Sequence, residues 1–306
     1  MNAKAPSTRA RPNAKAPSTR ARRLLGAAPF LKWAGGKGQL LTEILTRLPA
    51  KIDGTYIEPF IGGGAVFFEL ARQKRIKRAR LSDRNAELVT TYCAIRDSVE
   101  DVIKSLAQHK NDEEHFYRVR EIDPKTLSAP ECAARTIFLN RVGYNGLYRV
   151  NSRGLFNVPF GRYKNPKICD PDALRHVARS LSIADIVVSD FEESCGHARV
   201  GDVVYLDPPY VPVSKTASFT SYSGRFGEEE HRRLAQTFVR LVDVGAFVLL
   251  SNSDADLSRS LYEGFKIDTV NATRAINSRA DRRGVVREVL VQGLRVEQQR
   301  RYRAAR

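Results

Sequence analysis

Residues 56–64 read Tyr-Ile-Glu-Pro-Phe-Ile-Gly-Gly-Gly and lead directly into the helical pattern 65–70, Ala-Val-Phe-Phe-Glu-Leu. This order predicts a short strand, a glycine turn and a helix, which is the first βα unit of a nucleotide-binding sheet. The glycines do not follow GxGxxG, because the third glycine position falls on Phe67. We therefore expect a ligand whose adenosine and amino-acid parts lie along the turn, rather than a dinucleotide pyrophosphate.

A carboxylate follows the turn at a suggestive distance. Residues 80–83, Arg-Leu-Ser-Asp, read as a second short strand that ends in an acid. Asp83 lies 21 residues after Gly62, close to the ~20 residues expected for an acid that accepts hydrogen bonds from ribose hydroxyls. Each signal is weak alone, but their order and spacing together indicate an adenosine-binding site.

A second glycine-containing segment precedes this unit, and order is expected to begin with it. Residues 29–37 read Pro-Phe-Leu-Lys-Trp-Ala-Gly-Gly-Lys, and the apolar spacing over 40–48 predicts an amphipathic helix. The segment is not a phosphate loop, because the pattern GxxxxGK[ST] would place its first glycine on Leu31 and its Ser/Thr on Gly38. It either brings backbone close to a ligand or is a glycine turn beside the only tryptophan, Trp33.

The run Val203-Val204-Tyr205-Leu206 predicts a buried strand, and it is followed by Asp207-Pro208-Pro209-Tyr210. Two prolines cannot extend the hydrogen-bond ladder, so the chain leaves the strand as a stiff loop. A carboxylate and an aromatic ring are then presented at the carboxyl end of the strand, where open α/β sheets bind ligands. The pair suits a flat ring that carries an amine; a turn that is acidic and aromatic by accident is the alternative.

The middle of the chain is helical and then irregular. Asn85 is expected to cap a long helix that runs to about Gln108, with further helices over roughly 112–121 and 129–142. Residues 143–164 lose this periodicity and interleave basic, amide and aromatic side chains without a single acid. This composition is typical of a surface that reads nucleic acid; a solvated basic hairpin is the alternative.

Regular α/β alternation resumes after this segment, so we predict an α/β fold with a Rossmann-like sheet and a mostly helical insert. The ranges 211–225 and 274–283 read as a Ser/Thr-rich lid and a basic loop. The predicted elements are helices near 170–181 and 228–242 and strands near 186–188, 246–252, 264–270 and 285–292. The predicted domains are a catalytic domain over 29–84 and 168–295, a target-recognition domain over 85–167, and basic tails over 1–28 and 296–306.

Composition narrows the partners. The chain has 306 residues, 42% of them hydrophobic, and a formal net charge of +17, which favours a polyanion such as nucleic acid as partner. No run approaches the ~18 apolar residues of a membrane span. Four cysteines without a CxxC or Pro-Cys pair, and histidines without ligand spacing, predict neither metal nor thiol chemistry. Residues 2–11 recur as 13–22, and this acid-free tail is expected to be a disordered DNA tether or an accidental duplication.

Five motifs occur in a diagnostic order: FLKWAGGK, EPFIGGG, LSD, LNRVGYNGLYRVNSRGLFNVPFGRY and DPPY. Together they resemble the DNA adenine-N6 methyltransferases of the Dam type, the α group of the D12 class, from about residue 29 to 292. The resemblance implies an S-adenosylmethionine-dependent Rossmann-like sheet and a double-stranded DNA substrate, with GATC as the target. It further implies a monomeric enzyme of bacterial or phage cytoplasm, of the kind used in restriction-modification or in marking DNA for mismatch repair.

The resemblance also implies roles for individual residues. The catalytic residues would be Asp207, Pro208, Pro209 and Tyr210. The cofactor contacts would be Trp33, Lys37, Phe60, Gly62, Gly64, Asp83 and Asp207. The DNA contacts would be Lys32, Tyr144, Asn145, Leu147, Arg149, Pro159, Arg162 and Tyr163. The chain departs from the closest pattern at Gly63, Ala65, Val142, Tyr148 and Val150. The changes at Val142, Tyr148 and Val150 leave the flanking-sequence preference open.

Three other functions remain possible from the residues. An amino-methyltransferase that acts on RNA or on a protein glutamine would share the fold, but such families have Asn before the prolines, where this chain has Asp207. A non-enzymatic DNA-binding protein would explain the charge but not the glycine turn, Asp83 and DPPY together. A dehydrogenase is disfavoured by the glycine spacing.

Overall fold

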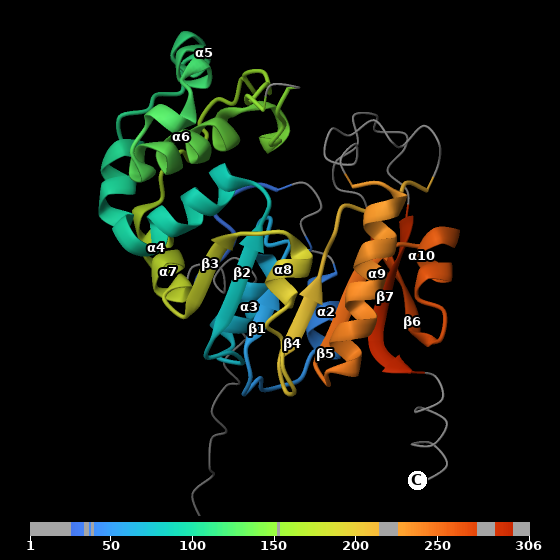
Figure 1. Cartoon of the computed structure of the whole chain (residues 1–306). Helices are drawn as coiled ribbons and strands as arrows, with labels where there is room; N and C mark the ends of the chain where they lie inside the picture. The colour runs from blue at the N-terminus through green and yellow to red at the C-terminus, as the bar shows by residue number, and fades with distance from the viewer. Residues whose placement is uncertain are drawn as a thin grey trace, which may run out of the picture.

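The computed structural model describes residues 26–33, 37, 40–151, 154–213, 226–273 and 285–295. Within these residues the strands form one seven-stranded sheet in the order β3-β2-β1-β4-β5-β7-β6 (Figure 1). β7 runs antiparallel to both of its neighbours, and the other pairings are parallel. The strands are β1 (Tyr56–Glu58), β2 (Ala79–Asp83), β3 (Ala184–Val188), β4 (Val203–Leu206), β5 (Phe247–Ser253), β6 (Phe265–Thr273) and β7 (Val285–Arg295). The predicted α/β class is confirmed.

Helices cover both faces of this sheet, because successive strand side chains point to opposite sides. In β4, Tyr205 joins one hydrophobic core while Val204 and Leu206 join the other. The first core packs beneath α2 (Leu41–Arg47), α3 (Ala65–Arg72) and α7 (Pro171–Leu181), and the second beneath α8 (Phe191–Cys195), α9 (Glu228–Asp243) and α10 (Asp256–Leu261). Strands buried on both faces read as continuous apolar runs, which is why β4 was recognisable from sequence.

A helical group stands beyond the carboxyl ends of the strands (Figure 1). It contains α4 (Ala86–Leu106), α5 (Glu113–Glu121), α6 (Ala129–Val142) and the short 3-10 turns η1 (Pro124–Thr126) and η2 (Tyr144–Gly146). The Asn85 side chain accepts the Leu88 N–H and caps α4, as predicted. α4 packs against α6 on one side and against α7 and β3 on the other, so it joins the helical group to the sheet.

Some predictions differ from the structure or fall outside it. The helices α8 and α10 were not predicted, because five or six residues are too few to show a helical period. β6 and β7 extend to Thr273 and Arg295, further than predicted. Residues 1–25, most of the predicted lid, the loop 274–283 and the tail 296–306 lie outside the described residues. In the described part of the chain, no helix has the length and apolarity needed to cross a membrane.

Candidate active site

Acidic residues occupy the carboxyl ends of four neighbouring parallel strands. Glu58 is the last residue of β1 and Asp83 the last residue of β2, while Asp207 follows β4 and Asp190 lies two residues beyond β3. Because these strands are adjacent and parallel, the four carboxylates share one edge of the sheet. This edge suits a ligand that carries positive charge and hydrogen-bond donors.

The glycine turn after β1 has a backbone that other residues rarely adopt. Gly62 and Gly64 have φ angles of 45° and 68°. A Cβ atom at Gly62 would lie 2.9 Å from Cδ1 of Trp33, and one at Gly64 would lie 2.8 Å from the Tyr92 hydroxyl oxygen. The turn is therefore closely packed from behind, and only glycine fits these two positions.

Asp83 is held against this turn. Its Oδ2 accepts the N–H of Gly62 at 3.3 Å, and its Oδ1 accepts the N–H of Asn85 at 2.9 Å. Burial raises the pKa of the Asp83 carboxyl to about 6, against the lowering effect of these backbone donors. The predicted ribose acid and the predicted glycine turn are thus brought together by a direct hydrogen bond.

Glu58 is the most strongly perturbed acid of this edge. It is buried, and its Oε2 accepts a hydrogen bond from the Tyr56 hydroxyl at 2.8 Å. Burial raises the pKa of Glu58 to about 8, helped by the charge of Asp207 and opposed by the Tyr56 hydrogen bond. The sequence predicted no role for this residue.

Replacing Glu58 with glutamine should change how stability depends on pH. The raised pKa means that folded protein keeps a proton which the unfolded chain, with a pKa near 4.5, releases. Glu58 therefore destabilises the native protein progressively as the pH rises from about 4.5 to about 8, by up to ~1.4 kcal/mol per pH unit. Urea unfolding at several pH values should show a stability gain for Glu58→Gln that grows over this range. A gain independent of pH would contradict it.

Asp207 is fixed by two partners that contact the same oxygen. Its Oδ1 lies 2.7 Å from Nζ of Lys37 and accepts a hydrogen bond from the Ser251 hydroxyl at 2.8 Å. Ser251 is in turn 3.0 Å from the Tyr205 hydroxyl. Lys37 is buried, so this ion pair lies largely out of water. The sequence implied that Lys37 contacts the cofactor; in the structure it contacts the predicted catalytic carboxylate.

The aromatic ring of the DPPY segment is held at one face and at its hydroxyl group. Nζ of Lys37 lies 4.4 Å from the ring centroid of Tyr210, a cation–π distance. The Tyr210 hydroxyl donates to Oε2 of Glu288 on β7 at 2.7 Å. Pro208 is buried and Pro209 partly so. The four residues Asp207 to Tyr210 thus form a rigid corner at the end of β4, which supports the interpretation of DPPY as an active-site element.

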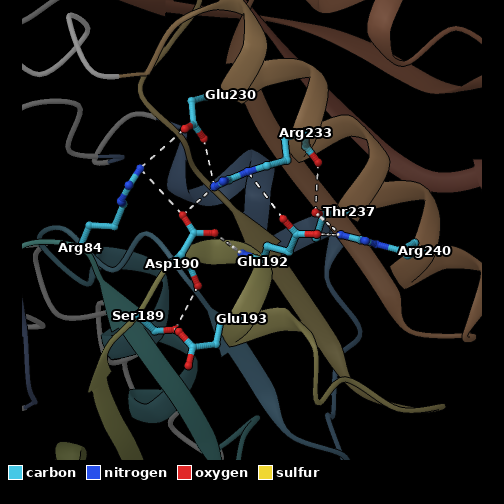
Figure 2. A network of polar contacts seen from close by, with 9 residues as sticks. All are labelled: Arg84, Ser189, Asp190, Glu192, Glu193, Glu230, Arg233, Thr237 and Arg240. Carbon is cyan, nitrogen blue, oxygen red and sulfur yellow. Dashed lines mark hydrogen bonds and ion pairs between the residues drawn. The ribbon is translucent and has the colours of Figure 1, made fainter.

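The residues that follow the carboxyl end of β3 were not predicted to belong to the site. Phe191 stacks against Phe60 of the glycine-turn segment, with ring centroids 5.6 Å apart and planes 27° apart. Oδ2 of Asp190 pairs with Arg233 at 2.6 Å, and the Arg233 guanidinium lies 4.5 Å from the Phe191 ring centroid. Figure 2 shows the surrounding network, which also contains Arg84, Ser189, Glu192, Glu193, Glu230, Thr237 and Arg240. The signal available was an acid after the apolar run 186–188, as at Asp83 and Asp207.

One buried amide fastens the recognition segment, residues 143–164, to the loop that carries Lys32 and Trp33. The Asn140 side chain accepts the N–H of Lys32 at 2.8 Å and donates to the carbonyls of Lys32 and Gly146 at 2.7 and 3.0 Å. Nζ of Lys32 lies 4.9 Å from the ring centroid of Tyr163. Asn140 was not predicted, although it lies within the quoted LNRVG motif.

The recognition segment folds back on itself. Gly143 pairs with Phe160, and the N–H of Tyr144 donates to the carbonyl of Pro159 at 2.8 Å. This pairing brings two predicted DNA contacts together and leaves both exposed. Arg149 is exposed and donates through Nε to Oδ1 of Asn157 at 2.8 Å. The remaining predicted contacts are exposed or partly exposed: Asn145, Leu147, Arg162 and Tyr163. Arg162 is exposed, and its Nη2 lies 3.9 Å from Oε1 of Glu113.

A basic cavity of about 300 Å³ adjoins this segment. Arg141 enters it from α6; its Nη2 donates to the Phe30 carbonyl at 2.7 Å, while its buried Nε has no hydrogen-bond partner among the described residues. Burial and the neighbouring Arg141 lower the pKa of Lys32. The cavity is lined by Lys32, Arg141, Tyr163, Lys164, Asn165, Pro166 and Lys167. Such a concentration of cationic groups suits a phosphate.

Comparison with known proteins agrees with this geometry. A model of the D12 class N6 adenine-specific DNA methyltransferase family matches residues 33–276. The Type II methyltransferase M1.LlaDCHI of Lactococcus lactis subsp. cremoris is 43% identical over 272 residues, covering 86% of this chain and 94% of that protein. The DNA adenine methylase of Escherichia coli (strain K12) is 37% identical over 266 residues, covering 85% and 93%.

Among solved structures, precorrin 8w decarboxylase from Methanobacterium thermoautotrophicum is similar at 13% identity and a TM-score of 0.39, with 87% of this chain and 97% of that chain covered. This likeness is too low to bear on function. The family match, by contrast, includes the glycine turn, the recognition segment and DPPY. The chain belongs to the D12 class N6 adenine-specific DNA methyltransferases, enzymes that methylate adenine in DNA with S-adenosylmethionine as the methyl donor.

Proposed function

We propose that this enzyme methylates N6 of an adenine that is flipped out of double-stranded DNA, at one short site with GATC as the expected sequence. The observation that carries the chemistry is the fixed carboxylate of Asp207, held at the end of β4 by Lys37 and Ser251. The exposed basic segment after α6 supports DNA as the polymer that brings the adenine.

The residues at the sheet edge fit S-adenosylmethionine. The glycine turn, packed closely on Trp33 and Tyr92, brings its backbone to the end of β1, and Asp83 beside it can accept hydrogen bonds from ribose hydroxyls. We assign Phe191 and Asp190 to the adenine ring and its amino group. The carboxylate of Asp207 complements the positive charge of the sulfonium and ammonium groups, whereas Glu58, whose pKa burial raises to about 8, stays protonated at neutral pH. When bound, S-adenosylmethionine supplies the electrophilic methyl group.

Asp207 and Pro208 would activate the target amine. The N6 lone pair of adenine is conjugated into the ring, so the amino group is a poor nucleophile. Both observed partners of Asp207 contact Oδ1, and we therefore assign Oδ2 to one N6 hydrogen and the Pro208 carbonyl to the other. Accepting both hydrogens draws N6 towards tetrahedral geometry and directs its lone pair at the methyl group, so positioning supplies most of the catalysis. No covalent enzyme intermediate is needed.

Base flipping is required because an adenine inside a duplex cannot reach this corner, and extrusion costs a few kcal/mol. The Tyr210 ring, fixed between Lys37 and Glu288, offers a stacking face that can return ~1–3 kcal/mol. Lys37 lies over one face, and we assign the adenine to the other. Tyr144, exposed next to Pro159, would fill the space that the base leaves in the duplex.

Sequence would be read by exposed side chains, and the backbone would be held by the basic cavity. Arg149, with its guanidinium oriented by Asn157, can bond a guanine edge bidentately. The cavity around Arg141 and Lys164 would take a backbone phosphate. Lys32 lines the cavity and precedes Trp33 in the chain. It would therefore lie where the DNA backbone approaches the loop of Lys32 and Trp33.

Arg149→Ala and Lys164→Ala should separate these two roles. Losing Arg149 should cost ~1–3 kcal/mol of discrimination at one base pair, because a bidentate contact to one base is removed. Losing Lys164 should weaken binding to all DNA sequences equally. It should also reduce the magnitude of the slope of log K against log salt by about one, because one phosphate contact is removed. Fluorescence anisotropy with a specific duplex and single-substitution duplexes, at several salt concentrations, measures both. If Arg149→Ala behaves like Lys164→Ala, then Arg149 is a phosphate contact.

The overall proposal is tested by incubating purified protein with S-adenosylmethionine and unmethylated plasmid DNA and mapping modified bases by sequencing. We expect N6-methyladenine at GATC and at no other motif. Methylation at a different single motif would overturn the GATC assignment alone. Methyl transfer to RNA or to protein, with none to duplex DNA, would overturn the proposed substrate.

A further inference from the structure

Tyr148 of the recognition segment contacts two parts of the protein that surround the proposed cofactor site. Its ring stacks on Trp33, with centroids 5.0 Å apart and planes 26° apart. Its hydroxyl donates to Oε2 of Glu87 at 3.0 Å. Tyr148 lies between Leu147 and Arg149 in the chain, both of them proposed DNA contacts. A single side chain therefore joins the DNA-reading surface to the loop of Lys32 and Trp33 and to the start of α4.

Glu87 is a rigid anchor. Its Oε1 accepts hydrogen bonds from Nη1 of Arg135 at 3.0 Å and from the Thr136 hydroxyl at 2.7 Å. Arg135 is 2% exposed and also donates to two backbone carbonyls of α5, so it cannot easily move. Glu87 lies two residues after Asn85, whose N–H is bonded to Asp83. The anchor of Tyr148 and the proposed ribose acid are thus on one short, capped stretch of chain.

Trp33, which stacks on Tyr148, also packs against the glycine turn. The space behind Gly62 is filled by the Trp33 indole, because a Cβ atom there would lie 2.9 Å from Cδ1. The N–H of Gly62 donates to Asp83. The contacts therefore run from Tyr148 through Trp33, Gly62 and Asp83 to the start of α4, and back through Glu87 to Tyr148. We therefore expect a displacement of Tyr148 to change how Trp33 packs against the glycine turn.

We propose that Tyr148 is a positioning residue that couples DNA recognition to cofactor binding, which rests on the proposed function of the two sites. In the free enzyme, the arrangement with Tyr148 seated between Trp33 and Glu87 exchanges with an unseated one, and the recognition segment binds a duplex more tightly when Tyr148 is seated. The cofactor likewise binds the glycine turn and Asp83 more tightly when Tyr148 is seated. Each ligand therefore raises the affinity of the other by the same factor, as thermodynamic linkage requires.

The test is the ratio of two dissociation constants for S-adenosylhomocysteine, measured by calorimetry without and with a saturating GATC duplex. For the unaltered enzyme we expect the duplex to tighten binding by about 10-fold, within the usual range of coupling between sites. Tyr148→Leu should bring the ratio close to one while each ligand alone binds within about threefold of normal. Tyr148→Phe keeps the stack but loses the bond to Glu87, and its ratio should be intermediate.

Tyr117→Leu is the matched control, because Tyr117 is an aromatic residue of α5 that packs against Phe116 rather than Trp33. Its ratio should equal that of the unaltered enzyme. A ratio near one for an unaltered enzyme that methylates DNA would overturn the coupling and leave the proposed function standing. If Tyr148→Leu leaves the ratio unchanged, or if this variant binds either ligand alone much more weakly than the unaltered enzyme does, then Tyr148 only packs the structure and does not couple the two sites. Should Tyr148→Leu not fold, an unchanged ratio in Tyr148→Phe is equally fatal.

Discussion

Asp207→Ala is expected to lower the single-turnover rate of methyl transfer by about 10³-fold or more, while the dissociation constant for duplex DNA stays within a few-fold. The variant removes the acceptor that would bond the N6 hydrogen and fix the lone-pair direction. Loss of one preorganised electrostatic partner typically costs ~10²–10³-fold, and loss of alignment adds to it. DNA affinity should persist, because it depends on the basic segment and cavity beyond the strand ends. Transfer of a labelled methyl group and anisotropy with a labelled duplex measure the two quantities.

One complication of Asp207→Ala comes from Lys37. This lysine is buried and pairs with Asp207 at 2.7 Å, so the variant leaves a buried charge without that partner, which is destabilising. The double variant Asp207→Ala/Lys37→Met removes the buried lysine charge as well. If activity returns in the double variant, the loss was caused by Lys37 and not by the missing carboxylate. Ser251→Ala is a milder control, because it removes one hydrogen bond to Oδ1 and keeps the carboxylate.

Local patterns in the sequence were sufficient for the elements that position the site. The strand of β4 is apolar on both faces and ends at two prolines, and β1 ends at a glycine turn; both signals lie within ten residues. The acids at Asp83 and Asp207 follow from the same logic, because ligands bind at the carboxyl ends of parallel strands. Asp190 obeys this rule too, and was overlooked because Phe191 and the short helix α8 carry no periodic signal.

The contacts that connect these elements were not accessible in this way. Asn140 bonds Lys32 across 108 residues of chain, and Trp33 meets Tyr148 across a similar span. Such pairs depend on how α6 and the recognition segment pack beside the sheet, which no local period encodes. The same holds for the pKa of Glu58, because its burial is a property of the assembled sheet edge. The composition of the chain predicted DNA as the partner. The cavity around Arg141 could not be predicted, because its lining residues come together only in the folded protein.

Asp83→Ala is expected to weaken the binding of S-adenosylmethionine by at least about 100-fold. A hydrogen bond to a charged group contributes ~1.5–3 kcal/mol, and the carboxylate is proposed to bond two ribose hydroxyls. The variant also frees the N–H groups of Gly62 and Asn85, so part of the loss would come from a looser turn. Asp83→Asn is the cleaner change, because its amide oxygen can still accept one of these N–H groups. Calorimetry with S-adenosylmethionine measures both variants.

The pH dependence distinguishes a ribose acceptor from a residue that only shapes the turn. Burial raises the pKa of Asp83 to about 6, and the ionised carboxylate is the better acceptor for hydroxyl groups. Affinity should therefore be full above about pH 6 and fall by up to ~10-fold for each pH unit below it. In Asp83→Asn the weaker affinity should be constant between about pH 5 and pH 7, because the side chain cannot titrate. If Asp83→Asn keeps the dependence of the unaltered enzyme, another group controls it and Asp83 does not bind the ribose.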